Sequence, residues 1–301
     1  MRRARLTLAL ALAWGAGAAA LVACGSFGSA GEAAPDAADD DARRDDLEAG
    51  GDAGLTDAPS PEGSADAGTV FATFPTPIQA LACGPGPSPI YVALETEIRT
   101  VRKADGVIES VVIPHAARHV QIDNPVVFAS GDTVRRGALG VQLVATQNGG
   151  VGGVATTPNP AGGVVYYSSL ANHSIRVVDG VNPPSDFGLT VLPAEGLLVR
   201  AGSLYAAVPE ANRVIVFSLD GGAQTGAVNT GDVYALASSA THLYWVAKST
   251  RAIRFAPWVK LDEIGVLVPP SAGTEPMQAI CADPEYLYFG VGTQLRRVPL
   301  R

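Results

Sequence analysis

Short apolar segments separated by polar breaks recur along the chain from about residue 69 to its end. The unit is clearest at residues 235–255, where apolar segments at 235–237, 242–246 and 251–255 are joined by two tight turns. Its middle segment, built around a central aromatic, returns at Ile90-Tyr91-Val92, Val127-Phe128-Ala129, Val165-Tyr166-Tyr167, Leu204-Tyr205-Ala206 and Leu287-Tyr288-Phe289. From Tyr91 to Tyr288, the central aromatics are 37, 38, 39, 39 and 44 residues apart. Six copies of a strand-rich unit of about 40 residues predict an all-β, six-bladed β-propeller.

A third strand follows the aromatic segment in each unit and contains arginine in five of the six, as in Ile98-Arg99-Thr100-Val101 and Ile253-Arg254-Phe255. A fourth apolar segment follows in five units, but the last unit stops after its third. The segment 69–74 stands alone before the first unit, so we expect it to complete the last four-stranded blade and close the ring. We expect the repeated arginines to cover aromatic rings or pair with carboxylates.

The repeated aromatic pair and the later Ile-Arg step resemble the six-bladed propellers of the YWTD and NHL-like group. The segment His242-Leu243-Tyr244-Trp245-Val246 is similar to the Tyr-Trp-Thr-Asp strand of that group, although Val246 and Ala247 stand in place of Thr and Asp. The resemblance covers about 230 residues. It implies the architecture, whereas this fold hosts enzymes, receptors and scaffolds alike.

The N-terminus has the form of an export signal, with three arginines before an apolar core and then Leu21-Val22-Ala23-Cys24. This segment resembles the lipobox of bacterial lipoproteins. The resemblance implies a signal peptide at 1–23, diacylglycerol on the Cys24 sulfur, and acyl chains such as palmitate that anchor the protein in a membrane. Gly25 after the cysteine implies the outer membrane of the cell envelope. An ordinary secretory signal and an uncleaved membrane helix are the alternatives.

Residues 24–68 contain almost no large apolar side chains, so we predict a disordered tether between the anchor and a folded domain at 69–301. The acids are concentrated there: residues 29–68 carry a net charge of −10, and residues 69–301 carry −1. The near-neutral domain lacks the basic surplus that nucleic-acid binding usually needs, so we expect no nucleic-acid partner. We also expect a monomer.

Cys83 and Cys281 fall on the innermost strands of the first and last units, which a closed ring makes neighbours. Outside the cytoplasm they are candidates for a disulfide bond. Two buried, unpaired thiols are the alternative.

Each innermost strand carries an apolar anchor, and the residues before the anchors predict a binding surface. The residue directly before each anchor is Ala or Gly except at His119, as expected where blades crowd together. The residue two before shares the anchor's face of the strand. Together with His119, the polar residues at those positions are predicted to ring one mouth of the central channel: Gln79, Arg118, Glu195, Tyr234 and Gln278. Satisfaction of strand ends is the alternative explanation of these residues.

The function expected from these features is binding: a lipid-anchored envelope propeller that presents a surface to a protein, peptide or glycan. The Gly- and Pro-rich insertion from Thr156 to Gly163 is a further candidate contact. No catalytic motif or cofactor site is recognised. The alternative is a metal-assisted hydrolase or lyase, similar to gluconolactonases or streptogramin lyases, with a divalent ion held by Glu195 and His119 in the channel.

Overall fold

The computed structural model describes residues 68–300 except 124–125, 138–140, 158–162, 181 and 272. The expected signal peptide, Cys24 and the tether up to residue 67 lie outside the described residues, as does the middle of the insertion from Thr156 to Gly163.

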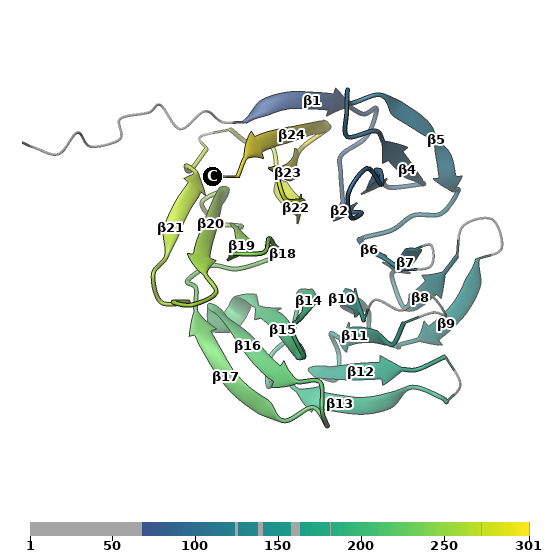
Figure 1. Ribbon diagram of the computed structural model, residues 1–301. Helices are drawn as coiled ribbons and strands as arrows, with labels where there is room; N and C mark the ends of the chain where they lie inside the picture. Colours follow the sequence, from purple (N-terminus) through teal and green to yellow (C-terminus); the bar gives the residue numbers. More distant parts are fainter. Residues whose placement is uncertain are drawn as a thin grey trace, which may run out of the picture. The chain divides into compact units, whose positions relative to one another are not determined.

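Six antiparallel sheets of four strands surround a central axis, with the first strand of each unit innermost (Figure 1). The predicted six-bladed propeller is therefore confirmed. The innermost strands are β2 (Ala80–Cys83), β6 (His119–Ile122), β10 (Val151–Thr156), β14 (Gly196–Arg200), β18 (Leu236–Ser238) and β22 (Met277–Ala282). The aromatic second strands are β3 (Ile90–Ala93), β7 (Val126–Ser130), β11 (Val165–Ser169), β15 (Ser203–Val208), β19 (His242–Ala247) and β23 (Tyr286–Val291).

The third strands carry the repeated arginines, and the fourth strands form the rim. The third strands are β4 (Ile98–Val101), β8 (Thr133–Arg136), β12 (Ser174–Val178), β16 (Arg213–Ser218), β20 (Ala252–Pro257) and β24 (Gln294–Pro299). The outer strands are β5 (Ile108–Ile113), β9 (Gln142–Thr146), β13 (Ser185–Leu189), β17 (Gln224–Asn229), β21 (Gly265–Val268) and β1 (Thr69–Thr73). A single 3₁₀ turn, η1 (Pro209–Ala211), joins β15 to β16.

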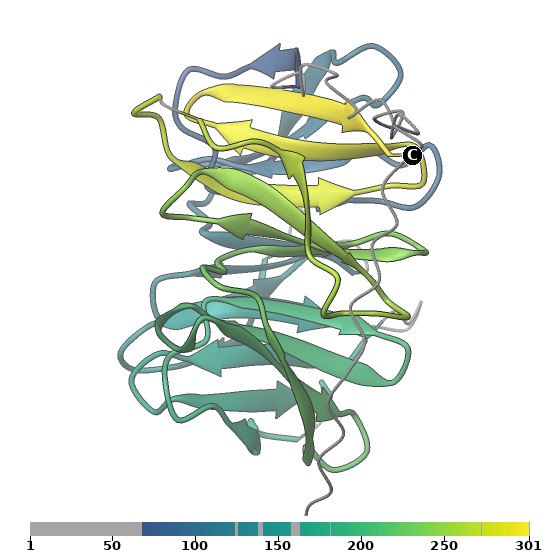
Figure 2. The ribbon, with the colours of Figure 1, turned by 90° about the vertical axis from the view of Figure 1, so that its left-hand side faces the viewer.

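Both faces of a blade are buried, because each sheet packs against the sheets before and after it (Figure 2). Strand β19 shows the consequence. Leu243 and Trp245 pack in the cluster shared with the preceding blade, whereas Tyr244 and Val246 pack in the cluster shared with the following one. Successive side chains point to opposite faces of a strand. A second strand therefore reads as a continuous apolar run rather than as an alternating one.

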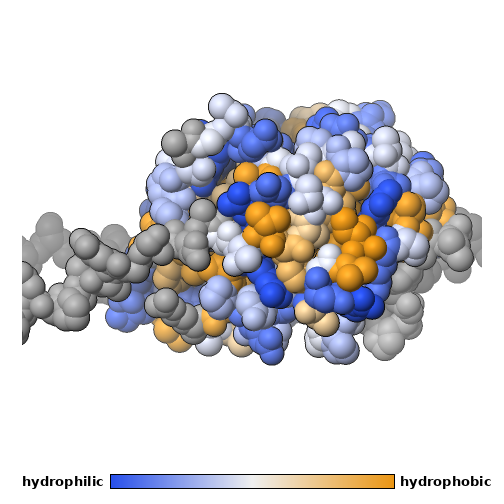
Figure 3. All heavy atoms as spheres, turned by 90° about the horizontal axis from the view of Figure 1, so that it is seen from above, coloured by the Kyte–Doolittle hydropathy of each residue, from blue (hydrophilic) through white to orange (hydrophobic). Residues whose placement is uncertain are grey.

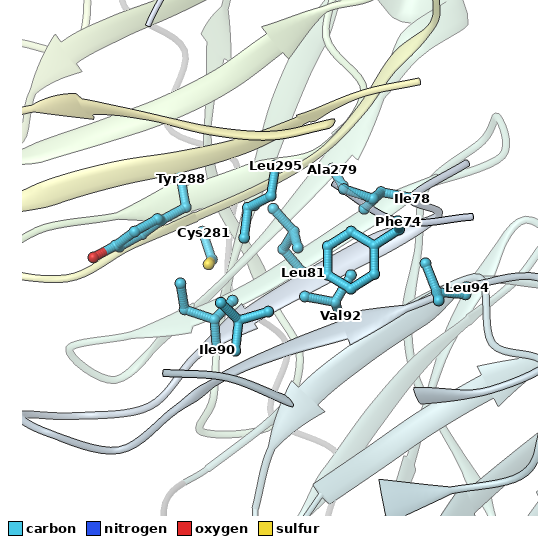
Figure 4. Close-up of a cluster of buried hydrophobic side chains, with 11 residues drawn as sticks. Phe74, Ile78, Leu81, Ile90, Val92, Leu94, Ala279, Cys281, Tyr288 and Leu295 are labelled. Atoms are coloured by element: carbon cyan, nitrogen blue, oxygen red, sulfur yellow. The ribbon is translucent and has the colours of Figure 1, made fainter. Parts of the chain in front are cut away.

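The last sheet has the order β1-β24-β23-β22, so the first strand of the domain completes the last blade, as predicted. Thr69 lies opposite Arg297 and Thr73 opposite Gln294. Inside this closure, apolar side chains of the first and last blades form one cluster, which includes Phe74, Leu81 and Tyr288 (Figure 4). The ring is thus closed by both hydrogen bonding and packing.

The third-strand arginines have structural roles, as predicted. The Arg297 guanidinium lies 4.4 Å from the centre of the Phe71 ring. Arg176 Nε lies 3.1 Å from Asp186 Oδ1, and Arg136 pairs with Asp123 at 2.8 Å.

The rim is mixed in character, with apolar groups set among polar ones (Figure 3). Five outer strands each carry at least one exposed large apolar side chain, including Val70, Val111, Leu143, Leu189 and Val266. Scattered exposed residues of this kind are normal on protein surfaces, so they mark no binding face by themselves.

Candidate functional site

The six innermost strands all run in one direction along the axis, so their starts converge at one mouth of the channel and their ends at the other. A cavity lies at each end. We call the cavity at the strand starts the axial socket and the cavity at the strand ends the wide recess.

The axial socket has a volume of about 60 Å³. The structure brings together around it all six residues for which the sequence predicted a shared mouth: Gln79, Arg118, His119, Glu195, Tyr234 and Gln278. The third blade supplies no polar side chain here, because Gly152 stands at the corresponding position. The strand is also bulged there, since its register shifts between Val151 and Gly153.

Small residues before the anchors allow the blades to approach at the axis. A Cβ atom on Gly196 would lie 2.6 Å from the carbonyl oxygen of Tyr234 in the next blade. A Cβ atom on Gly153 would lie 3.1 Å from the backbone nitrogen of Leu197. The predicted crowding is therefore real, and it is what keeps the axial socket small.

The charged side chains at the axial socket differ in their surroundings, and Glu195 has a positively charged neighbour. Lys248 Nζ lies 3.9 Å from Glu195 Oε2 and 4.3 Å from the centre of the Tyr234 ring. Burial raises the pKa of Tyr234, and the negative charge of Glu195 adds to the effect. His119 is half-buried and lies beside Arg118, so desolvation, assisted by that positive charge, lowers the pKa of its imidazole to about 4. At neutral pH the ring of His119 is therefore uncharged.

The two residues named for the metal-assisted alternative lie at the same cavity. Glu195 and His119 both line the axial socket, but no group of three His, Cys, Asp or Glu side chains suited to a metal ion occurs among the described residues. The nearest charged partner of Glu195 is instead the ammonium of Lys248.

The wide recess has a volume of about 900 Å³, and the sequence analysis missed it. Its walls are the ends of the innermost strands and the turns after them, and the lining includes Gly84, Pro85, Ile122, Leu198, Ser239 and Pro284. Small and apolar residues thus form most of the wall. The signal in the sequence was the run of Gly, Pro, Ser and Ala after these strands, but turn composition does not tell where a turn points.

An ion pair and several hydrogen bonds hold the turns around the wide recess. Lys103 donates hydrogen bonds to the carbonyl oxygens of Gly84 and Gly86, at 2.6 and 3.1 Å, and lies 3.3 Å from Asp283 of the last blade. The side chains of Lys103 and Asp283 are only 10% and 9% exposed. Arg200 donates to the carbonyl oxygens of Ser239 and Ala240 in the next blade. The wall of the wide recess is therefore braced across blade boundaries.

Cys83 and Cys281 form a disulfide bond, with Cα atoms 5.5 Å apart. It joins the ends of β2 and β22, and Cys83 contributes to the wall of the wide recess. In the described residues, no helix has the length and apolar character needed to cross a membrane.

Comparison with known proteins identifies the architecture. No protein-family model and no curated protein sequence matches the chain. Its structure is similar to a gluconolactonase from Xanthomonas campestris, with a TM-score of 0.61 and 14% identity over 77% of this chain and 89% of that one. It is also similar to virginiamycin B lyase from Staphylococcus aureus, with a TM-score of 0.56 and 13% identity over 74% of this chain and 80% of that one. A chain of a nidogen–laminin complex gives a TM-score of 0.56 and 15% identity over 67% of this chain and 84% of that one.

These similarities define the class of protein, a six-bladed β-propeller, and agree with the architecture that the YWTD and NHL-like resemblance implied. At such identities they show the fold alone. The three structures include two enzymes and a member of a protein–protein complex, so the fold does not by itself decide between catalysis and binding.

Proposed function

We propose that this protein is a lipid-anchored component of the bacterial cell envelope whose propeller binds part of a protein, peptide or glycan in the wide recess. The observation that carries this proposal is the recess itself. Its volume of about 900 Å³ lies within the range of about 300–1,000 Å³ typical of ligand pockets. The axial socket, at about 60 Å³, is too small to hold more than a few atoms of such a partner.

Rigidity of the recess supports a binding role. Its wall is joined across blades by the Cys83–Cys281 disulfide, by the Lys103–Asp283 ion pair and by the hydrogen bonds of Arg200. A surface that is already ordered loses less entropy when a partner binds.

The proposed location in the cell envelope rests on the sequence, and the Cys83–Cys281 disulfide is consistent with it. Disulfides persist in oxidising compartments outside the cytoplasm. A lipid on Cys24, with an acidic tether up to residue 68, would hold the domain at the outer membrane while leaving it free to meet an envelope partner.

Catalysis is the weaker candidate. A gluconolactonase and a lyase are among the similar structures. No group of three His, Cys, Asp or Glu side chains suited to a metal ion occurs among the described residues. We therefore place the partner in the wide recess and treat it as a ligand rather than a substrate.

Site-specific photo-crosslinking of the full-length protein in its native cells tests the proposal. A photoreactive amino acid at Ala240 or Pro284 lies at an exposed position of the wide recess, and one at Val266 on the outer strand β21 is the matched control. We expect the same envelope protein, peptide or glycan to be captured from Ala240 and Pro284 but not from Val266. Equal capture at all three positions, or capture from Val266 alone, would contradict the recess as the binding surface.

The same cells test the anchor. Cys24→Ser is expected to move the protein from the membrane fraction to the soluble fraction and to abolish incorporation of labelled palmitate. If the unaltered protein incorporates no labelled palmitate, the lipid anchor is wrong, and an ordinary secretory signal or an uncleaved helix is left.

A further inference from the structure

The axial socket concentrates polar side chains that have no partner among the residues the structure describes. Gln79, Arg118 and Gln278 line it from three different blades. Among the described residues, none of these three side chains makes a hydrogen bond or an ion pair. Arg118 is exposed and the two glutamines are half-buried, so water reaches all three side chains, and a ligand that binds in the socket would replace that water.

Hydrogen-bond donors exceed acceptors around this cavity. The Arg118 guanidinium carries five N–H donors and no acceptor, and the Tyr234 hydroxyl and the two glutamine amides can also donate. The negative charge of the socket belongs to Glu195, which already lies beside Lys248. Within the described part of the chain, the positive charge of Arg118 is thus left without a counter-ion.

The charge of the axial socket indicates which ligand it can bind. A single uncompensated guanidinium matches a group with one negative charge, and the planar fork of arginine binds the two oxygens of a carboxylate in parallel. A cavity of about 60 Å³ has room for several water molecules, at roughly 10–15 Å³ for each, and so for a carboxylate and an atom or two beyond it. It has no room for a sugar ring or a peptide.

We infer that the axial socket is an anion site that binds the carboxylate of a small organic acid or of a longer ligand's end, with Arg118 as the charged partner and Gln79, Gln278 and Tyr234 as hydrogen-bond donors. The neutral ring of His119 lies in the same wall, adds no charge, and has one N–H that can donate.

This site is separate from the wide recess. The two cavities lie at opposite ends of the innermost strands, and Gln121 borders both. Loss of carboxylate binding would therefore leave the proposed partner binding untouched, and the reverse also holds.

Titration of the purified full-length protein with sodium acetate, followed by nuclear magnetic resonance of the histidine side chains, tests the inference. His119 is the reporter, assigned with His119→Gln, and His115, His173 and His242 lie outside the socket lining and serve as internal controls. We expect acetate to shift the His119 signal saturably, with a dissociation constant on the order of millimolar. The other three histidine signals should stay in place.

Two charge variants give opposite expectations. Arg118→Gln should weaken acetate binding at least about tenfold, because it removes the unpaired positive charge. Glu195→Gln should tighten it severalfold, because it removes the nearest negative charge and frees Lys248. Arg102→Gln is the matched control, since it removes an arginine that pairs with Asp105 on an exposed turn. This variant should bind acetate as the unaltered protein does.

Three results would overturn the inference. The His119 signal could stay unchanged up to high acetate concentration. Phosphate could bind more tightly than acetate, which would assign the site to a phosphate group. Calcium or magnesium could bind and be lost in Glu195→Gln, which would make the socket a cation site and revive the metal-assisted alternative.

Discussion

His119 is a titratable side chain at the centre of the ring, on the innermost strand of the second blade. Its pKa of about 4 has a direct consequence for stability. In the unfolded chain an imidazole takes up a proton near pH 6.5, whereas in the folded protein His119 does so only near pH 4. Between these values the unfolded state binds more protons, so stability falls as the pH falls.

We expect His119→Gln to remove this part of the pH dependence. From pH 6.5 down to 4, the free energy of unfolding of the unaltered protein should decrease by at most about 3 kcal/mol more than that of the variant. Above pH 7 the two profiles should run parallel. Urea unfolding across this range, without added carboxylate, measures the difference. Parallel profiles at all pH values would mean that the imidazole is as well solvated in the folded state as in the unfolded one.

Strand β1 is short and largely exposed, yet we expect it to be needed for closing the ring. It covers the edge of β24, and its Phe71 ring lies 5.6 Å from the ring of Tyr288 and stacks under Arg297. Without β1, the strand β24 would present a row of unpaired backbone groups to solvent.

Deletion of residues 69–73 from the full-length chain is therefore expected to lower the urea midpoint and to cause self-association through β24. Size-exclusion chromatography with light scattering detects the association. A control that keeps the strand but replaces an exposed side chain, Val70→Thr, should remain monomeric and close to the unaltered protein in stability. A monomeric deletion variant of unchanged midpoint would show that packing of the first blade against the last is sufficient to close the ring.

The strands could be predicted because every blade buries both faces, which leaves the same apolar run in each unit. The polar residues of the axial socket could be predicted as well, because they stand at one register position of the innermost strands. The wide recess could not be predicted, because much of its wall is made of turns. The Lys103–Asp283 pair joins turns that are 180 positions apart in the chain, and no local pattern indicates that these two side chains meet.

For the whole molecule, three of the interactions that join the first and last blades differ in kind. β1 pairs with β24 at the rim, the Cys83–Cys281 disulfide joins the innermost strands, and Lys103 pairs with Asp283 at the wide recess. The strand pairing and the ion pair stabilise the folded protein only. The disulfide differs, because it also links positions 198 residues apart in the unfolded chain.

Removing the disulfide should therefore cost stability without opening the ring. In the loop-entropy model, a closed loop of this length is worth about 5 kcal/mol through the unfolded state. We expect Cys83→Ala/Cys281→Ala to lose several kcal/mol of unfolding free energy and to keep its β-sheet circular dichroism and its crosslinking at Ala240. The unaltered protein under reducing conditions is the control, because it lacks the bond but keeps both sulfur atoms. If the reduced protein unfolds at the same urea concentration as the oxidised one, the bond does not restrict the unfolded chain. The reduced protein could instead lose part of its stability together with crosslinking at Ala240. That result would mean that the disulfide shapes the recess directly. It would also mean that the pairing of β1 with β24 and of Lys103 with Asp283 cannot hold the ring closed without the bond.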